Sequence, residues 1–349
     1  MIYIGIFIAL FTVAWLADRY QFTWATRAQL LYGETALLVL FAGLRNNSIG
    51  LDSADGYHRY FNFLLVGKSL DSWVEPLYVW MNKAVIFLGG NYQWILFLTA
   101  LLCVIPMAYL FDRYTEHALW AMALYYGLYF YQQTFNIMRQ CIAMSFCFLA
   151  VDMALRKKYI RAGLCMLVAI GFHKTAWIFF LGLLMIWVRF NLRQAAIIFL
   201  GTYLLGFIMT TKTILLFVPK IYQHYFFREG NAMRSDSGWG VPLQVLGINL
   251  AVLVACYACP RSLKNPWMRI LAAGVAVLNL TQNMTQGYRL AYYFLQAQCL
   301  AIPEVLHVPR EKNRKLMTLL FLVISLALFA SNLSMQWKYM TPYRLFFMP

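Results

Sequence analysis

Charged residues are scarce in this chain. Only 12% of its 349 residues are charged, whereas 62% are hydrophobic and 17% are aromatic, and its mean hydropathy is +0.62. A soluble domain of this size could not stay in solution with so little charge, which excludes a soluble globular protein. We therefore expect an all-α, polytopic integral membrane protein with the bilayer as its solvent.

Acidic residues are scarcer still, with 13 Asp and Glu against 29 Lys and Arg, which gives a net charge of +16. Basic loops on the inner side of a membrane, attraction to anionic lipid, and an anionic substrate each explain such an excess. Nucleic acid is the least favoured partner, because the basic residues are scattered among apolar segments and not gathered on one soluble face. We expect no nucleic-acid partner.

Motifs for metals, nucleotides and disulfides are also missing. The chain has no D-x-D, no H-E-x-x-H, no His/Cys cluster, and no Walker or Rossmann glycine pattern. All seven cysteines lie within or at the ends of apolar segments, where cysteine behaves as a small hydrophobe. Cys256 and Cys259 form a C-x-x-C, but no second pair accompanies it and Pro260 follows, so packing is favoured over a metal or redox role. We expect no cofactor and no metal.

The apolar segments predict a single integral membrane domain over residues 1–349 with about 12 transmembrane helices, at roughly 20 residues a span. Residues 1–17 count as a span, because neither a basic segment nor a small-residue cleavage site marks them as a signal peptide. No internal repeat typical of many secondary transporters is present. The predicted spans are 1–17, 28–44, 91–111, 118–134, 137–155, 161–173, 176–190, 194–211, 241–259, 268–285, 288–302 and 316–334.

The segment 74–90 decides the topology. It is apolar but contains Glu75, Pro76, Asn82 and Lys83, and we interpret it as a juxtamembrane or re-entrant helix. Counting it as a span would move every later loop to the opposite side of the membrane. With it outside, the basic loops 156–161, 189–193, 261–269 and 310–315 lie inside, as the positive-inside rule predicts. Both termini and two longer segments, 45–90 and 211–240, then lie on the extracytoplasmic side of a bacterial inner membrane.

Unusual polar residues gather on that predicted outer side. Ionisable groups at a membrane boundary cost roughly 2.5 to 3.5 kcal/mol each and usually face a bundle interior or a water-filled cavity. Such a collection on one side predicts a site. Its members are Arg45, Asn46, Asp52, Asp55, Tyr57, Glu75, Asn136, Arg139, Gln140, His173, Lys174 and Arg289.

Two of these positions suggest specific chemistry. Asn136, Arg139 and Gln140 share one face of a first helical turn if a span begins near residue 136, and a helix N-terminus with a guanidinium binds phosphate oxygens. The alternative is that Arg139 reaches the lipid headgroups and Asn136 caps the helix. His173 ends an apolar run beside Lys174, and close cations would keep its imidazole neutral, as a general base requires. The alternative is an interfacial hydrogen-bonding histidine.

The remaining candidates lie in the first outer loop and near residue 289. Asp52 could orient or deprotonate a sugar hydroxyl, and Tyr57 could stack on a sugar ring. The alternative is a solvated polar loop. Arg289 begins the eleventh predicted span among aromatic residues, where a side chain that reaches toward the headgroups is an equal alternative.

Several of these residues follow a familiar order. Arg45, Gly50, Asp52 and Tyr57 form R-x(4)-G-x-D with a following tyrosine, and Glu75-Pro76 comes next. An N-x-x-R-Q at 136–140 and an H-x-x-A at 173–176 complete the series, which covers roughly the first 180 residues. The series resembles the EpsG-like branch of Wzy-type polysaccharide polymerases.

The resemblance implies an architecture related to GT-C glycosyltransferases and a periplasmic active site. The implied reaction polymerises undecaprenyl-pyrophosphate-linked oligosaccharides, which serve as donor and acceptor, into O-antigen, capsule or exopolysaccharide. A flippase and a chain-length regulator of the same pathway are the implied partners besides membrane lipid.

For such a transfer, we assign donor pyrophosphate to Arg139 and Arg289, and acceptor phosphate or sugar to Arg45. His173 is the expected base with Asp52 orienting the acceptor, although Asp52 as base is nearly as well supported. Tyr57, Glu75, Asn136, Gln140 and Lys174 complete the expected substrate-binding set, and no metal is required if arginines stabilise the departing charge. A lipid-linked oligosaccharide flippase, a glycan ligase and a non-catalytic partner in polysaccharide export are the competing functions.

Overall fold

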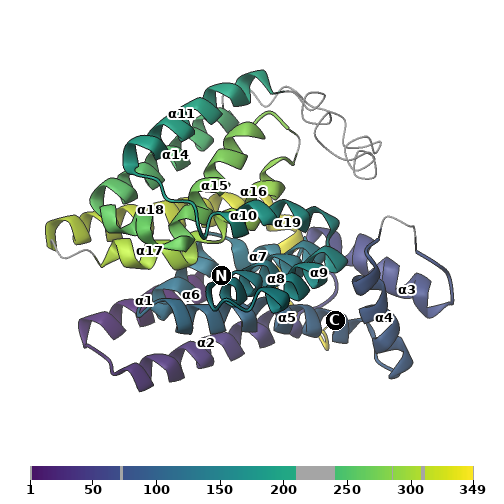
Figure 1. Ribbon diagram of the computed structural model, residues 1–349. Coiled ribbons are helices and arrows are strands. Elements are labelled where there is room, and N and C mark those ends of the chain that lie inside the picture. The colour runs from purple at the N-terminus through teal and green to yellow at the C-terminus, as the bar shows by residue number, and fades with distance from the viewer. Residues whose placement is uncertain (1, 71–73, 210–239, 285, 308–310, 349) are drawn as a thin grey trace. The chain divides into compact units, whose positions relative to one another are not determined.

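The computed structural model describes residues 2–70, 74–209, 240–284, 286–307 and 311–348, and the regular secondary structure of these residues is helical (Figure 1). In these residues, the only β-structure is an isolated bridge between Arg45 and Leu345. The all-α prediction is therefore confirmed for this part of the chain. The predicted loop at 211–240 lies, apart from its last residue, outside the described residues.

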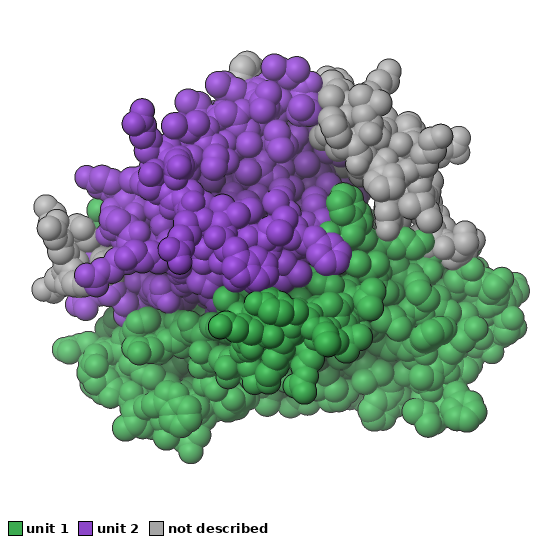
Figure 2. All heavy atoms as spheres, in the orientation of Figure 1, with its two compact units in different colours: residues 1–177, 315–349 green, residues 178–314 purple. Residues whose placement is uncertain are grey.

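The chain forms two compact units. Unit 1 comprises Met1–Trp177 and Lys315–Pro349, and unit 2 comprises Ile178–Arg314 (Figure 2). Each unit is described by itself below.

Unit 1 contains the long N-terminal helices, the helices of the first loop, and the C-terminal segment. Its first loop begins with a π-helix, Ser53–His58. Its α-helices are α1 (Ile2–Arg19), α2 (Trp24–Gly43), α3 (Arg59–Leu65), α4 (Pro76–Phe87), α5 (Tyr92–Tyr114), α6 (Ala118–Gly127), α7 (Phe130–Gln133), α8 (Met138–Leu155), α9 (Tyr159–Phe172), most of α18 (Glu311–Met335), and α19 (Trp337–Met340).

Unit 2 follows a 3-10 helix, Lys174–Phe179, that crosses the boundary between the units. A buried pair of asparagines, Asn249 and Asn279, joins two of its helices through reciprocal hydrogen bonds of 2.6 and 2.9 Å. Its elements are α10 (Phe180–Leu184), α11 (Leu192–Ile208), α14 (Gly240–Ala258), a 3-10 helix (Pro260–Lys264), α15 (Pro266–Leu280), α16 (Tyr288–Leu295) and α17 (Gln298–Leu306).

Five described helices are long and apolar enough to cross a membrane: residues 2–19, 92–114, 138–155, 241–258 and 314–335. The window 314–335 is only 28% buried inside the protein, and 241–258 only 33%. Apolar helices left so open require lipid around them. The protein is therefore a helical, polytopic membrane protein. The count of about 12 spans and the relation to GT-C enzymes stay predictions.

Some predicted spans are interrupted. In the span predicted at 118–134, α6 ends at Gly127 and Tyr129 takes a left-handed conformation with φ +70° before α7 begins. A left-handed residue cannot continue a right-handed helix. The span predicted at 288–302 is likewise divided between α16 and α17. The segment 74–90 contains α4, whose 12 residues extend about 18 Å, well short of a hydrocarbon core of about 30 Å.

One end of unit 1 collects both ends of the described chain and the start of the first loop. The Tyr3 hydroxyl donates to the Met340 carbonyl over 2.9 Å. Backbone hydrogen bonds of 2.8 and 2.9 Å join Asn46 to Arg344 and Phe346 to Leu44. We call this the first-loop end, defined by residues 44–50 and 337–346. The shared position agrees with a topology in which both termini and the first loop lie on one side.

Helix α8 runs from the first-loop end to an opposite end that carries Arg156, Lys157 and Lys158, which we call the basic-loop end. It is 78% buried and forms the centre of unit 1. Arg139 lies in its first turn and Asp152 in its last. The two residues are 13 positions apart, which is a rise of about 20 Å along the helix. The two charged regions of α8 therefore lie far apart.

Candidate active site

Glu75 is placed by the start of helix α4. Proline favours the first position of a helix, because its φ is already fixed near the helical value and its missing N–H would have no partner there. Pro76 takes that position, and Glu75 precedes it in an extended conformation (φ −67°, ψ 142°). The Glu75 side chain does not cap its own helix and is fully buried. It is directed instead at two other segments.

The Glu75 carboxylate joins three segments of the chain. Its Oε1 atom lies 2.9 Å from Nδ1 of His173 and accepts a hydrogen bond from the backbone N–H of Lys174 over 3.1 Å. Its Oε2 atom pairs with Nη1 of Arg139. The Arg139 and His173 side chains are only 9% and 13% exposed. One carboxylate thus collects groups that lie 64 and 98 residues away in the sequence.

The neighbours of Glu75 keep it ionised. Burial alone raises the pKa of this carboxyl, but the hydrogen bond and charge of His173, the charge of Arg139 and the N–H of Lys174 outweigh burial and lower the pKa to about 2. A carboxylate with so low a pKa is a poor general base at neutral pH. Glu75 is therefore suited to positioning Arg139 and His173.

Arg139 also lies against two aromatic rings. Its guanidinium carbon is 5.8 Å from the centroid of Tyr57 and 5.9 Å from that of Tyr78. These distances fall within the range of cation–π attraction. Tyr57 and Tyr78 themselves meet edge to face at 5.5 Å. We call Tyr57, Glu75, Tyr78, Arg139 and His173 the Glu75 cluster.

Asn136 does not lie where the sequence places it. Helix α8 begins at Met138 with Ile137 as the residue before it, so both the first-turn position and the alternative of an Asn136 cap are wrong. Its Oδ1 accepts from the Leu51 N–H over 2.6 Å, and its Nδ2 donates to Oε1 of Gln336 over 2.6 Å. Asn136 therefore fastens the first loop to the C-terminal segment. Gln140 lies in the first turn of α8 and is buried.

The R-x(4)-G-x-D segment has a structural basis. Gly50 has φ +108°, and a Cβ atom there would lie 2.4 Å from the Phe135 carbonyl oxygen. Arg45 is fully buried, with its guanidinium 4.4 Å from the Phe135 ring and donating to the carbonyls of Ala42 and Ile49. The Arg45 guanidinium thus holds the backbone of its own turn, and a role for Arg45 in binding the acceptor stays a prediction.

The other predicted residues have distinct outcomes. Asp52 directly precedes the π-helix and is partly exposed at the first-loop end. His173 ends α9, as expected for a span end. Its closest charged neighbour, however, is the anion Glu75 and not a cation, and a carboxylate favours the protonated imidazole. Lys174 meets Glu75 through its backbone N–H. Arg289 belongs to unit 2, so its place in the site stays a prediction.

Sequence reasoning missed several members of these networks. Tyr78 lies three residues after Glu75 on α4, and that helical spacing was a usable signal. No local sequence pattern marks Gln336, the hydrogen-bond partner of Asn136, as a member of such a network. Asp152 is fully buried in α8 and pairs with Arg113 at 3.0 Å and Arg156 at 3.5 Å at the basic-loop end. A lone aspartate in an apolar span could have predicted that ion pair.

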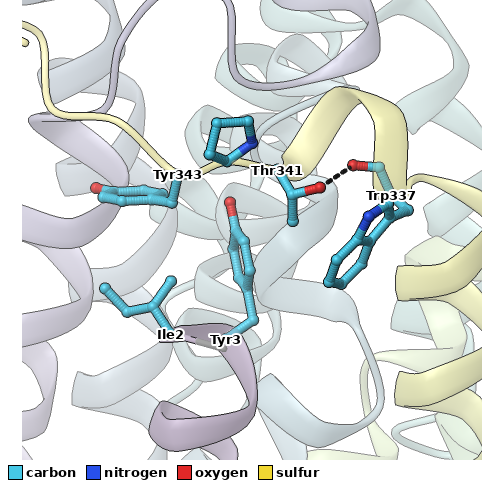
Figure 3. Close-up of a pocket in the computed structure, with 6 residues that line it drawn as sticks. Ile2, Tyr3, Trp337, Thr341 and Tyr343 are labelled. Carbon is cyan, nitrogen blue, oxygen red and sulfur yellow. Dashed lines mark hydrogen bonds between the residues drawn. The ribbon is translucent and has the colours of Figure 1, made fainter.

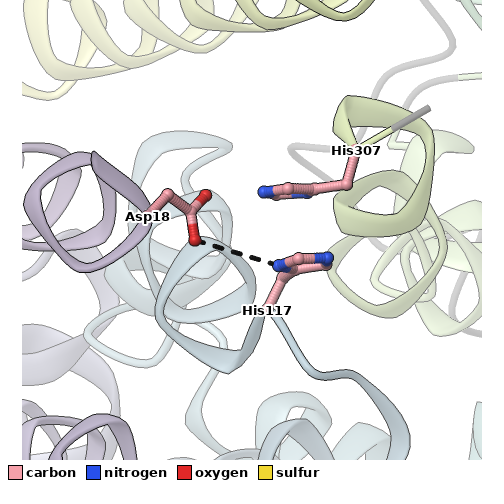
Figure 4. Close-up of side chains that lie close together, drawn as sticks. All are labelled: Asp18, His117 and His307. Carbon is pink, nitrogen blue, oxygen red and sulfur yellow. Dashed lines mark ion pairs between the residues drawn. The ribbon is translucent and has the colours of Figure 1, made fainter. Parts of the chain in front are cut away.

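The charges of the Glu75 cluster suit an anion better than a metal ion, because the carboxylate is already paired with a guanidinium. Elsewhere in unit 1, Asp18 and His117 lie 4.0 Å apart (Figure 4), and Asp18 also bonds Arg27 and Trp120. His307, drawn in the same view, belongs to unit 2.

Comparison with known proteins gives one finding about family. No curated protein and no solved structure matches the chain at a significant level. The model of the EpsG family matches residues 35–345, which is nearly the whole chain and includes every member of the Glu75 cluster. The protein belongs to the EpsG family.

Proposed function

We propose that this protein is a Wzy-type polysaccharide polymerase. In this reaction it transfers a growing glycan from undecaprenyl pyrophosphate to an acceptor sugar on another lipid-linked repeat unit. The EpsG family is associated with polysaccharide polymerases, and the match covers residues 35–345. The observation that carries the proposal is the Glu75 cluster, in which one buried carboxylate brings a guanidinium and an imidazole together.

The reaction requires the protein to provide a base for the acceptor and to stabilise the leaving pyrophosphate. The acceptor hydroxyl oxygen bonds to the anomeric carbon of the donor glycan, while the bond from that carbon to the pyrophosphate oxygen breaks. The hydroxyl proton passes to a base, and undecaprenyl pyrophosphate leaves with the bonding electrons. Negative charge therefore grows on the pyrophosphate as a proton leaves the acceptor.

Arg139 is the proposed group for the pyrophosphate. A guanidinium carries five N–H donors in a planar fork that matches phosphate oxygens, and Nη1 of Arg139 pairs with the Glu75 carboxylate. The rings of Tyr57 and Tyr78 and the Glu75 carboxylate hold the guanidinium in place. Such fixed cationic groups stabilise developing charge without reorganising during the reaction.

His173 is the proposed base, and Glu75 is its positioning residue. An imidazole that donates its Nδ1 proton to a carboxylate carries its lone pair on Nε2, and that carboxylate stabilises the imidazolium formed when the base takes a proton. The Nδ1 to Oε1 distance of 2.9 Å fits this arrangement. Asp52 stays the second candidate, because the neighbouring Leu51 is bonded to Asn136, three residues before Arg139.

The charge distribution along α8 supports a periplasmic site in a bacterial inner membrane. Arg156, Lys157 and Lys158 follow the end of α8 that lies opposite the Glu75 cluster, and basic loops face the cytoplasm. Between Gln140 and Asp152, α8 has no aspartate, glutamate, lysine, arginine or histidine. A flippase for a pyrophosphate lipid needs a path for charge between both faces, and α8 provides none, which favours the polymerase.

Incubation of the purified protein with a synthetic lipid-pyrophosphate repeat unit tests the proposal. A polymerase produces a ladder of lipid-linked glycans that grow by whole repeat units. A ligase instead transfers the glycan to a different acceptor and leaves no ladder on the lipid. A flippase moves the intact repeat unit across a vesicle membrane without forming any glycosidic bond, and that result would replace the polymerase.

A further inference from the structure

A cavity of about 480 Å³ opens at the first-loop end, outside the Glu75 cluster. Small-molecule sites usually occupy about 300 to 1,000 Å³. Its walls come from the start of α1 and from the C-terminal segment, both within unit 1 (Figure 3). The lining residues are Ile2, Tyr3, Trp337, Thr341, Pro342 and Tyr343.

Each side-chain hydroxyl group that lines this cavity already donates its proton to a backbone carbonyl. Thr341 donates to the Trp337 carbonyl over 2.7 Å, and Tyr343 donates to the Phe41 carbonyl over 2.6 Å. Tyr3 donates to the Met340 carbonyl over 2.9 Å. A hydroxyl whose proton is engaged still offers lone pairs as an acceptor. The lining therefore favours a ligand that brings its own O–H donors.

The two tyrosine rings of the cavity are held in place before any ligand arrives. Tyr343 stacks on Phe41 with 4.1 Å between centroids and 9° between planes, and Tyr3 meets Tyr343 edge to face at 6.0 Å. Trp337 is 50% exposed, so its indole is accessible. Rings fixed by packing lose little freedom on binding.

The engaged hydroxyl protons and the aromatic lining together favour one class of ligand over others. A sugar ring has C–H bonds on its faces, which pack on aromatic rings, and hydroxyl donors around its rim. An acyl chain has no donors for the Thr341 and Tyr343 oxygens. A phosphate group is itself an acceptor and would meet the acceptor oxygens of Tyr3, Thr341 and Tyr343, with the Trp337 indole N–H as the remaining side-chain donor among the lining residues. The lining therefore fits a sugar better than either part of a lipid.

The cavity is also connected to the candidate active site. Trp337 follows Gln336, whose side-chain oxygen accepts from Asn136, and Asn136 lies three residues before Arg139. We propose that this cavity is a glycan-binding subsite that holds a sugar of the chain away from the reacting unit. The inference rests on the proposed function only for the identity of the glycan.

Calorimetric titration of the full-length protein in nanodiscs tests the subsite. The probe is the lipid-free oligosaccharide that mild acid releases from the lipid-linked repeat units of the bacterium that naturally makes this protein. Trp337→Ala should weaken its binding on the order of tenfold, as loss of an aromatic contact at a binding site does. Thr341→Val, which keeps the side-chain shape but removes an acceptor, should weaken it as well.

Trp24→Ala is the matched control. Trp24 is 75% exposed and begins α2, whose 20 residues extend about 30 Å away from the first-loop end. Its substitution should leave binding unchanged. In the ladder assay, Trp337→Ala should shorten the products while the rate of the first addition is retained, because the subsite holds the chain and not the reacting groups.

The outcomes separate the subsite from the polymerase. Trp337-dependent binding by a protein that makes no ladder would support the subsite and reject the polymerase. If the protein makes ladders, but Trp337→Ala and Thr341→Val bind the oligosaccharide as tightly as the unsubstituted protein does, the subsite alone is rejected. Absence of binding by the unsubstituted protein would also reject it. Displacement of the oligosaccharide by undecaprenyl phosphate, with an affinity that depends on Trp337, would make the cavity a lipid site and overturn the inference.

Discussion

Replacement of Glu75 by glutamine separates a positioning role from a purely structural one. The substitution keeps the shape of the side chain but removes the charge between Arg139 and His173. The Arg139 side chain is 9% exposed, and a buried charge without its partner costs about 3 to 5 kcal/mol. The pKa of Glu75 is lowered from an ordinary 4.5 to about 2. This shift corresponds to a contribution to the free energy of unfolding on the order of 3 kcal/mol at neutral pH.

Asp152→Asn is the matched comparison for Glu75→Gln. Asp152 is another fully buried carboxylate paired with arginines, but it lies at the far end of the same helix. We expect both substitutions to lower the midpoint of thermal unfolding in detergent. Turnover per folded molecule should fall on the order of 10²- to 10⁴-fold only in Glu75→Gln, as for loss of an oriented general base.

The pH dependence of residual activity adds a second readout. A neighbouring carboxylate makes an imidazole more basic, so the acid limb of the rate profile should move to lower pH in Glu75→Gln. Loss of stability with normal turnover and an unchanged profile, as expected for Asp152→Asn, would refute the positioning role.

Three further predictions concern the base, metals and pH. His173→Ala should abolish chain extension while donor-lipid binding is retained; if it makes normal ladders and Asp52→Asn does not, the role of base belongs to Asp52. Activity should persist in EDTA, because arginine stabilises the phosphate charge, and loss of activity that a divalent ion restores would contradict this. Because the folded pKa of Glu75 lies below its ordinary value, its stabilisation should be complete above about pH 5.5 and decline as the pH falls from 4.5 toward 2. The difference in unfolding midpoint between the unsubstituted protein and Glu75→Gln should close over that range, and a difference that is constant down to pH 2 would show that the charge is not responsible.

The helices were largely predictable, because apolar runs and breaks are local properties of the sequence. The start of α4 at Pro76 and the end of α9 before His173 follow from proline geometry and from a change in polarity. Loop charge predicted that both termini and the first loop lie on one side of the membrane, and the side that each faces stays a prediction. The break at Tyr129 was not predicted: Gly127 ends α6 two residues earlier, but the left-handed residue itself is a tyrosine, a residue type that rarely takes that conformation.

Members of the Glu75 cluster were predicted individually but not as a network. Arg139 and His173 stood out as polar groups at span ends, and Glu75 as one in the first outer segment. Their pairing depends on contacts 64 and 98 residues apart, which no local pattern reveals. Arg45 shows the same limit, since its full burial against Phe135 emerges only when the loop packs on the segment before α8.

Arg139→Lys tests most directly whether the Glu75 cluster is the site of a polymerase. Lysine retains the positive charge but cannot form the planar fork of a guanidinium. In a ladder assay with the purified variant, and with undecaprenyl pyrophosphate binding measured in parallel, the account predicts a folded protein that binds this lipid at least about tenfold more weakly and forms no ladder. Normal ladders and normal lipid binding from folded Arg139→Lys would contradict the account.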